Sequence, residues 1–197
     1  MTEGRRTLSG MYRFTSIARP IDPAYLTNRA LLIVLPVAGL LGAGLAAFFD
    51  TGRDPLSMAF SGVLTAFAAW ALTRELAPDY NGAAFVALAF AWAANLALGV
   101  RLVLLVFVAL VLIRVVNRST GLPLRPFDTL GVLGFCIWAA MSTQQPLILL
   151  VASLAFLFDA QLEDPLRRHF LAAAACLAAF VWMLLDDAHV VAGDLTA

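Results

Sequence analysis

Six stretches of the chain contain no Asp, Glu, Arg or Lys, and they set its predicted organisation. These stretches are 30–49, 55–73, 80–100, 102–113, 129–158 and 170–185. A helix that crosses the roughly 30 Å hydrocarbon core of a bilayer needs about 20 apolar residues. The first three stretches and the last therefore predict one span each. The fourth is short, but Arg101 and Arg114 at its ends can extend their side chains to the headgroups, so we expect a span there too.

The stretch 129–158 is too long for one ordinary span and short for two. Its centre reads Ser142-Thr143-Gln144-Gln145-Pro146. This segment is polar and ends in a residue that breaks helices. We divide the stretch there, so the chain is predicted to be an all-α bundle of seven transmembrane helices, two of them short.

The arginines test this count independently, because cytoplasmic loops near span ends carry an excess of basic residues. With seven spans and the N-terminus inside, eleven of the 13 arginines lie on the cytoplasmic side, and only Arg53 and Arg101 lie outside. With six spans, Arg167 and Arg168 move outside and the ratio falls to nine against four. The distribution favours seven spans, with the N-terminus in the cytoplasm and the C-terminus outside.

The composition fits a polytopic membrane protein and excludes several other classes. Apolar residue types make up 62% of the 197 residues and charged types 13%, about half the charged share of a soluble domain. The 13 basic and 13 acidic residues balance, so nucleic acid is not an expected partner. All basic residues are Arg, which excludes a catalytic or Schiff-base lysine. Cys136 and Cys176 lack metal-binding spacing and are expected to be inert, buried thiols.

The landmarks that flank the spans recur in the same order in two halves of the chain. The matching segments are 19–22 with 125–128, 51–56 with 142–147, and 75–79 with 161–165. This order predicts three spans, one connecting span and three further spans, and a single connector makes the two repeats parallel. The predicted parts are a cytoplasmic segment 1–28, a repeat 29–99, a connector 100–124, a repeat 125–185 and an acidic extracytoplasmic tail 186–197. In its topology, this plan resembles that of the SWEET-type sugar facilitators and related small transporters.

Three aspartates each precede a proline at a predicted helix start. They are Asp22, Asp54 and Asp164. A carboxylate at the N-cap accepts the free N–H groups of the first turn, and proline at the next position loses nothing by lacking its own. We therefore predict that these three residues are N-caps.

Two other acidic residues do not fit this explanation. Glu75 and Asp159 lie at the C-terminal ends of the second and sixth spans, where the helix dipole disfavours a negative charge by up to about 1 kcal/mol. They occupy corresponding places in the two repeats, with Arg114 at the same depth. One hypothesis is an inner-facing site in which these three residues hold a polar substrate or ion, and the alternative is an interfacial collar of salt bridges. His169, beside Arg167 and Arg168, is expected at the surface, facing lipid phosphates.

Asn95 is the outstanding polar residue of the predicted membrane interior. It lies three residues after Trp92, on the same face of the helix. An asparagine beside an aromatic ring can form a small solute site. Hydrogen bonding between helices is the more common role of such a residue, and both interpretations stay open.

Three functional classes remain. The first is a passive facilitator or channel for a small solute, with Asn95, Trp92, Glu75, Asp159 and Arg114 as candidate substrate-binding residues. The second is a non-catalytic structural subunit of a larger membrane complex. The third is a membrane enzyme acting on a lipid headgroup at the cytoplasmic face. We expect the first and regard an enzyme as less favoured, because the sequence offers no convincing nucleophile or metal cluster.

No catalytic residue, metal site or cofactor is predicted. The expected location is the bacterial inner (plasma) membrane, which the chain would cross several times. The expected partners are membrane lipids, with other membrane subunits or further copies of this chain as alternatives.

Overall fold

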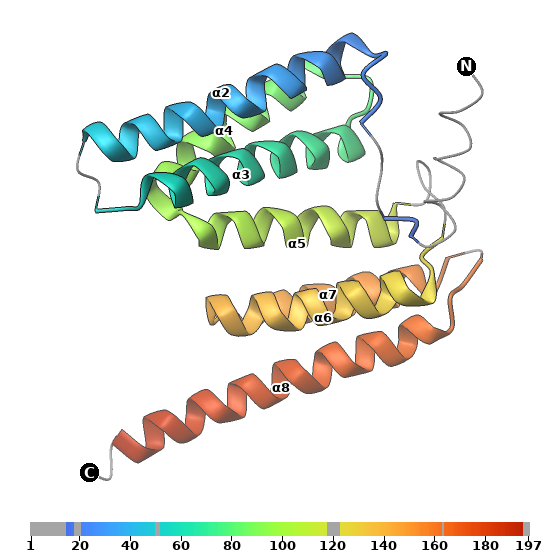
Figure 1. Cartoon of the computed structure of the whole chain (residues 1–197). Coiled ribbons are helices and arrows are strands. Elements are labelled where there is room, and N and C mark those ends of the chain that lie inside the picture. Colours follow the sequence, from blue (N-terminus) through green and yellow to red (C-terminus); the bar gives the residue numbers. More distant parts are fainter. Residues whose placement is uncertain (1–14, 18–20, 50–51, 118–122, 163, 195–197) are drawn as a thin grey trace. The chain divides into compact units, whose positions relative to one another are not determined.

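Seven α-helices form the regular structure of the described part of the chain, in which no strand occurs (Figure 1). The computed structural model describes residues 15–17, 21–49, 52–117, 123–162 and 164–194, with side chains as far as Asp186. The helices are α2 (Leu26–Phe48), α3 (Pro55–Leu76), α4 (Asn81–Leu98), α5 (Val100–Val116), α6 (Pro126–Thr143), α7 (Leu147–Asp159) and α8 (Arg168–Asp194). Each of the seven predicted spans therefore corresponds to one helix.

Four of these helices are long and apolar enough to cross a membrane: α2, α3, α4 and the part Arg168–Asp186 of α8. α5 has 17 residues, α6 has 18 and α7 has 13. At 1.5 Å per residue α7 extends for about 20 Å, less than the thickness of the hydrocarbon core. The prediction of an all-helical chain is confirmed, while seven membrane crossings and their orientation stay predictions.

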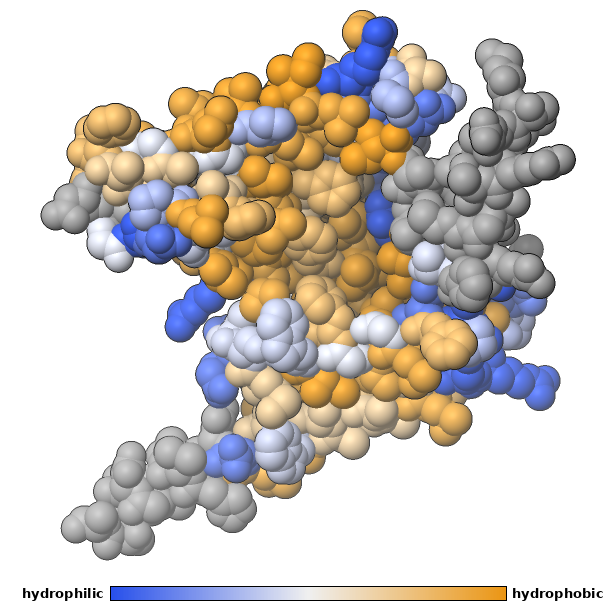
Figure 2. Space-filling model, viewed as in Figure 1, coloured by the Kyte–Doolittle hydropathy of each residue, from blue (hydrophilic) through white to orange (hydrophobic). Residues whose placement is uncertain are grey.

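Large apolar side chains cover much of the outer surface of the helices. Leu40, Phe90 and Trp182 are among those that are mostly exposed. On the face seen in Figure 2, hydrophobic residues lie along the helices, and the hydrophilic ones gather mainly near helix ends. A surface of this kind suits lipid rather than water, consistent with a membrane protein.

The predicted break inside 129–158 is confirmed. α6 ends at Thr143, and Gln144 adopts a left-handed conformation with φ 54° before α7 begins at Leu147. A left-handed residue ends the run of helical hydrogen bonds, and Pro146 then supplies no N–H of its own. The polar segment at the centre of the stretch thus separates two helices.

Of the three predicted N-caps, one is right and two are wrong. Asp54 is the N-cap of α3, and its carboxylate accepts the Ser57 N–H at 2.7 Å. Asp22 instead accepts the Ala24 N–H at 2.8 Å in a turn, and α2 begins only at Leu26. α8 likewise begins at Arg168, beyond Asp164. Aspartate followed by proline favours turns as well as caps, and the sequence alone does not separate the two uses.

The two ends of the chain are described in part. Of the predicted N-terminal segment 1–28, residues 1–14 and 18–20 lie outside the description. At the other end the backbone of α8 continues to Asp194, so residues 186–194 are helical, and the predicted tail 186–197 stays a prediction.

Two compact units make up the fold. One comprises residues 19–110, and the other comprises residues 1–18 and 111–197. In the first unit, α3 packs against both α2 and α4. In the second, α7 and α8 pack together, and α6 contacts both of them. The boundaries predicted for the two repeats stay predictions.

The core of the first unit is built from a few large side chains set against small ones. Leu31, Trp70, Leu88 and Leu110 are buried around alanines of α3 and α4. Because the alanines keep the helix surfaces smooth, neighbouring backbones can approach closely. The unit is thus held by close packing of helices rather than by many polar contacts.

Two glycines of α2, Gly39 and Gly42, lie close against α3. A Cβ atom added to Gly42 would lie 3.0 Å from the carbonyl oxygen of Met58, and one added to Gly39 would lie 2.9 Å from a methyl carbon of Val63. A Cβ on Gly44, in contrast, would meet nothing within 4 Å. α2 can therefore approach α3 this closely only where it has no side chain.

This difference predicts a graded response to substitution. Gly42→Val is expected to lower the free energy of unfolding by about 1–3 kcal/mol, because the new side chain meets backbone that cannot move away. Gly44→Val, with the same loss of glycine in the same helix, should have a much smaller effect. Unfolding in mixed detergent micelles would measure both, and equal losses would contradict the packing described.

Candidate functional sites

Asn95 forms a polar cross-link at the C-terminal end of α4. Its side chain is 0% exposed. In the amide orientation that satisfies every polar group, Nδ2 donates to Thr65 Oγ1 at 3.2 Å and to the Gly99 carbonyl oxygen at 3.1 Å. Oδ1 then accepts from the Ser61 hydroxyl at 3.1 Å and from the Gly62 N–H at 3.3 Å. An amide offers two donors and one acceptor oxygen, so protein groups occupy all of its hydrogen-bonding positions.

Trp92 points its polar atom toward a different helix. Its indole Nε1 donates to the carbonyl oxygen of Ala38 in α2 at 3.0 Å. Gly62 of α3 leaves space for the ring, since a Cβ there would lie 3.0 Å from Nε1. The two residues predicted as a solute site thus join α4 to α2 and to α3, and their substrate-binding role stays a prediction.

Arg53 binds the C-terminal end of α4 in the same unit. The sequence does not predict this role. Its guanidinium donates to the carbonyl oxygens of Leu96 at 2.9 Å and Ala97 at 2.8 Å, near the end of α4. The last carbonyls of a helix lack internal partners and carry partial negative charge, so an arginine stabilises them. Gly99 follows with φ 61°, a left-handed conformation that favours glycine.

Glu75 is buried at the C-terminal end of α3, with 5% of its surface exposed. The preceding Arg74 donates to the carbonyl oxygen of Pro78 and to the side chain of Asn81. Glu75 has an interaction partner within the protein. A buried carboxylate at this end of a helix is unusual, because both desolvation and the helix dipole oppose its charge.

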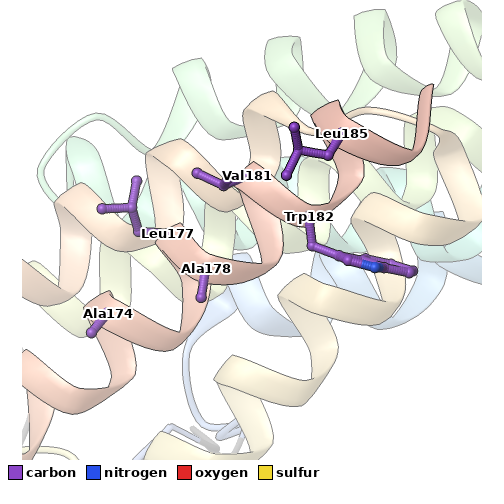
Figure 3. Close-up of a pocket in the computed structure, with 6 residues that line it drawn as sticks. All are labelled: Ala174, Leu177, Ala178, Val181, Trp182 and Leu185. Carbon is purple, nitrogen blue, oxygen red and sulfur yellow. The ribbon is translucent and has the colours of Figure 1, made fainter. Parts of the chain in front are cut away.

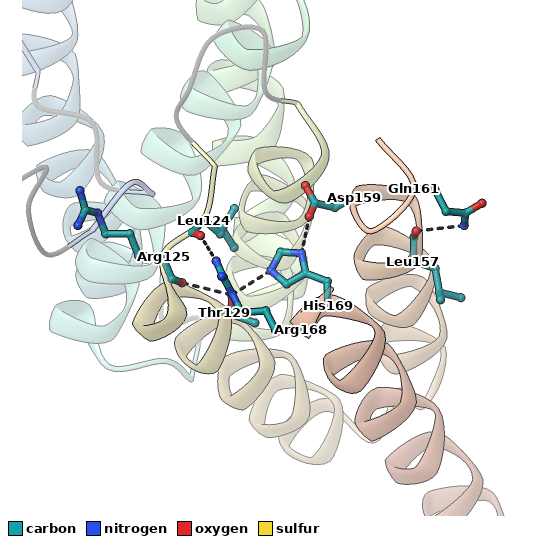
Figure 4. Close-up of polar contacts among 8 residues, drawn as sticks. All are labelled: Leu124, Arg125, Thr129, Leu157, Asp159, Gln161, Arg168 and His169. Carbon is teal, nitrogen blue, oxygen red and sulfur yellow. Dashed lines mark hydrogen bonds and ion pairs between the residues drawn. The ribbon is translucent and has the colours of Figure 1, made fainter. Parts of the chain in front are cut away.

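Asp159 and His169 form the most enclosed polar pair in the second unit. Asp159 is the last residue of α7 and His169 the second of α8, and both are 0% exposed. Asp159 Oδ2 lies 2.5 Å from His169 Nδ1 (Figure 4). The prediction that His169 faces lipid phosphates is therefore wrong, because the ring turns inward, packing edge-on against Phe156.

A threonine and an arginine complete this cluster. His169 Nε2 lies 2.9 Å from the hydroxyl of Thr129, in the first turn of α6. Arg168 Nε also reaches this hydroxyl, at 3.3 Å, and its guanidinium donates to the Leu124 carbonyl oxygen. The cluster therefore joins α6, α7 and α8 at one end of the unit.

A second cluster of hydrogen bonds holds the N-terminal segment 15–17 against the start of α6. Thr15 Oγ1 donates to Asp128 at 2.6 Å, and the backbone N–H and hydroxyl of Ser16 donate at 2.7 and 2.8 Å. Asp128 precedes the apolar stretch of α6. Burial on its own would raise its pKa, but the hydrogen bonds from Ser16 and Thr15 hold the pKa below its ordinary value.

Arg114 belongs to this second cluster. Its Nη1 donates to the carbonyl oxygen of Ile17 at 2.8 Å. Of the three residues predicted to hold a substrate together, Arg114 and Asp159 lie in the same unit but bind Ile17 and His169 respectively. Glu75 lies in the other unit. A site shared by all three stays a prediction.

Described residues of the second unit line two apolar grooves, among others. One lies along α8 between Ala174 and Leu185, has a volume of about 540 Å³ and is lined by apolar side chains such as Trp182 (Figure 3). The other, of about 280 Å³, lies beside Asp128 and Thr15 and is otherwise walled mainly by apolar residues such as Phe127 and Phe135. The α8 groove offers no chemically reactive group and resembles a lipid-facing surface.

No group of three or more metal-ligating side chains occurs among the described residues. No protein-family model matches the chain, and neither a curated protein sequence nor a solved structure is significantly similar to it. Function must therefore be argued from the polar clusters themselves.

The Asp159–His169 pair predicts a specific pattern of stability. His169→Phe should lower the free energy of unfolding by about 3 kcal/mol, because it leaves a buried carboxylate without the imidazole. The double variant Asp159→Leu/His169→Phe should lose less, because no charge then remains to be buried. Unfolding in mixed micelles measures both, and a double variant less stable than the single one would contradict this account of the pair.

Proposed function

We propose that the chain is a passive facilitator or channel for a small solute, built from two parallel three-helix repeats in a bacterial inner membrane. The observation that supports this most directly is the burial of one carboxylate at the end of a helix in each unit. Glu75 is next to last in α3, and Asp159 is last in α7. In the predicted threading these are the second helices of the two repeats.

The energetic cost of these two positions supports a functional role. Removing a carboxylate from water costs several kcal/mol unless partners compensate, and the C-terminal end of a helix adds a further penalty. Leu or Ala at these two positions would allow the helices to pack at a lower cost in free energy. Ionisable groups buried in membrane proteins more often mark substrate pathways than supply stability.

The predicted orientation supports the same interpretation. With the N-terminus in the cytoplasm, Glu75, Asp159 and Arg114 all lie at the cytoplasmic ends of their helices. A solute entering from that side would meet hydrogen-bonding groups there and apolar walls beyond them. A passive pathway requires only weak, reversible binding of this kind.

A non-catalytic subunit of a larger membrane complex is the second candidate. It is favoured by Asn95, whose amide is fully buried and fully hydrogen-bonded within the protein. An amide used in this way joins helices and leaves no donor or acceptor for a solute. Under this alternative, the binding surfaces would be the apolar outer faces of the helices.

An enzyme acting on lipid headgroups has less support. Asp159, His169 and Thr129 follow the order carboxylate, imidazole, hydroxyl that occurs in nucleophilic catalysis. The hydroxyl of Thr129, however, is buried and also lies 3.2 Å from the Arg125 carbonyl oxygen and 3.3 Å from Arg168 Nε. A nucleophile must contact its substrate, and this hydroxyl already contacts Arg125, Arg168 and His169.

Flux into liposomes containing the purified protein tests the proposal. Wild-type protein should accelerate the entry of at least one small polar solute. Glu75→Gln and Asp159→Asn should each reduce that flux by on the order of tenfold, the effect of losing one charge-assisted hydrogen bond. Asp186→Asn, which alters an exposed aspartate near the other end of α8, is the matched control and should leave the flux unchanged.

Two results would contradict the proposal. Absence of flux for every small solute, together with stable co-purification of other membrane subunits, would favour the structural alternative. Turnover of a lipid that is lost in Glu75→Gln or Asp159→Asn would favour the enzyme.

A further inference from the structure

We propose that the smaller groove of the second unit binds a phospholipid with a primary ammonium headgroup, whose nitrogen donates to Asp128 and Thr15 while part of an acyl chain lies along α6. The groove has a volume of about 280 Å³ and is lined by residues of the segment 15–17, α5 and α6. This site depends on the predicted crossing of the membrane by α6. It does not depend on whether the chain conducts a solute.

The polar end of the groove offers hydrogen-bond acceptors and no spare donor. The hydroxyl of Thr15 donates to Asp128 Oδ1 at 2.6 Å and accepts the Ile17 N–H at 3.3 Å, so one of its lone pairs is still available. Among the described residues, Oδ1 receives only this hydrogen bond, whereas Oδ2 receives three. Because each carboxylate oxygen has about two lone pairs to accept with, a ligand at this end must supply donors.

The carboxylate of Asp128 also favours a donor with a positive charge. The hydrogen bonds that it receives from the described residues come from hydroxyl and backbone N–H groups, and none comes from a guanidinium. Such neutral donors stabilise the ionised form of a carboxylate without cancelling its charge. An ammonium group supplies both the positive charge and the N–H donors. The exposed ring of Phe127, which also lines the groove, can attract the same cation.

The rest of the groove suits an acyl chain. From Asp128 its lining continues along one face of α6 as far as Phe135, about 10 Å away at 1.5 Å per residue. Gly131, between these two residues, leaves the groove open, since a Cβ atom added to it would meet nothing within 4 Å. A small hydrophilic amine would leave the apolar part of the groove without a matching surface. A phospholipid matches both parts.

The predicted orientation in the bilayer fits the same ligand. With the N-terminus in the cytoplasm, Asp128 lies at the cytoplasmic end of α6 and Phe135 lies deeper. A phospholipid of that leaflet has its headgroup and its acyl chains in the same order. Arg125 is exposed at the N-cap of α6 and adds a positive charge near the level of the phosphate. The zwitterionic headgroup thus has a charge of opposite sign for each of its own.

Lipids that differ only in the headgroup test the class of ligand. Native mass spectrometry of the purified protein would compare phosphatidylethanolamine, phosphatidylcholine and phosphatidylglycerol with identical acyl chains. Phosphatidylcholine has the same charges, but its nitrogen carries no hydrogen. We expect it to bind roughly tenfold more weakly than phosphatidylethanolamine, the effect of losing one charge-assisted hydrogen bond, and Asp128→Asn should abolish this difference. Equal binding of the two lipids, or tightest binding of phosphatidylglycerol, would overturn the proposal.

A pair of glycine variants tests the groove without altering its hydrogen bonds. Gly131→Leu should fill the groove and weaken the binding of phosphatidylethanolamine roughly tenfold, the effect of excluding about two methylene groups. Gly134→Leu is the matched control, because Gly134 lies in the same helix, does not line the groove and would also meet nothing within 4 Å of an added Cβ. It should leave the binding unchanged. Equal effects of the two variants, or no effect of Gly131→Leu, would place the lipid elsewhere and overturn the proposal.

Discussion

A polar side chain enclosed among apolar helices must find its partners within the protein, and this constraint shapes both units. Water is absent from the hydrocarbon core, so an unpartnered donor or acceptor costs several kcal/mol. Asn95 meets the requirement through Ser61, Thr65 and the Gly99 carbonyl. Asp159 and His169 face each other as a buried ion-pair contact at 2.5 Å, although Oδ2 and Nδ1 themselves make no hydrogen bond. The apolar packing around Asn95 can then remain close, because its amide has a partner for each donor and acceptor.

The two clusters solve the same problem with different chemistry. The amide of Asn95 is neutral at every pH and connects α4 to α3 by hydrogen bonds. This connection between the helices therefore does not depend on pH. The pair in the second unit contains two titratable groups and joins α6, α7 and α8 through Thr129. An uncharged, hydrogen-bonded side chain would be sufficient to hold these three helices together. The use of a carboxylate and an imidazole is therefore the stronger indication of a role in binding.

The sequence predicts the helices well because charge-free stretches and proline act locally. The break at 142–146 follows from polar residues next to Pro146, and the cap at Asp54 from its position before Pro55. The sequence does not predict which residues meet across helices. Its position beside two arginines predicts His169 at the surface, yet at the start of α8 the side chain is buried. Arg53 was predicted only as an outer charge, because its binding to the end of α4 depends on how two loops fold together.

The proposed function requires the chain to cross the membrane in such a way that Glu75, Asp159 and the arginine-rich loops lie on the same side. Single cysteines at Gln161 and Ala197, introduced in a Cys136→Ala/Cys176→Ala background, would test this in oriented inner-membrane vesicles with an impermeant thiol reagent. The account predicts that the cysteine at 161 reacts only from the cytoplasmic side and the cysteine at 197 only from the opposite side. Reaction of both from the same side would contradict it.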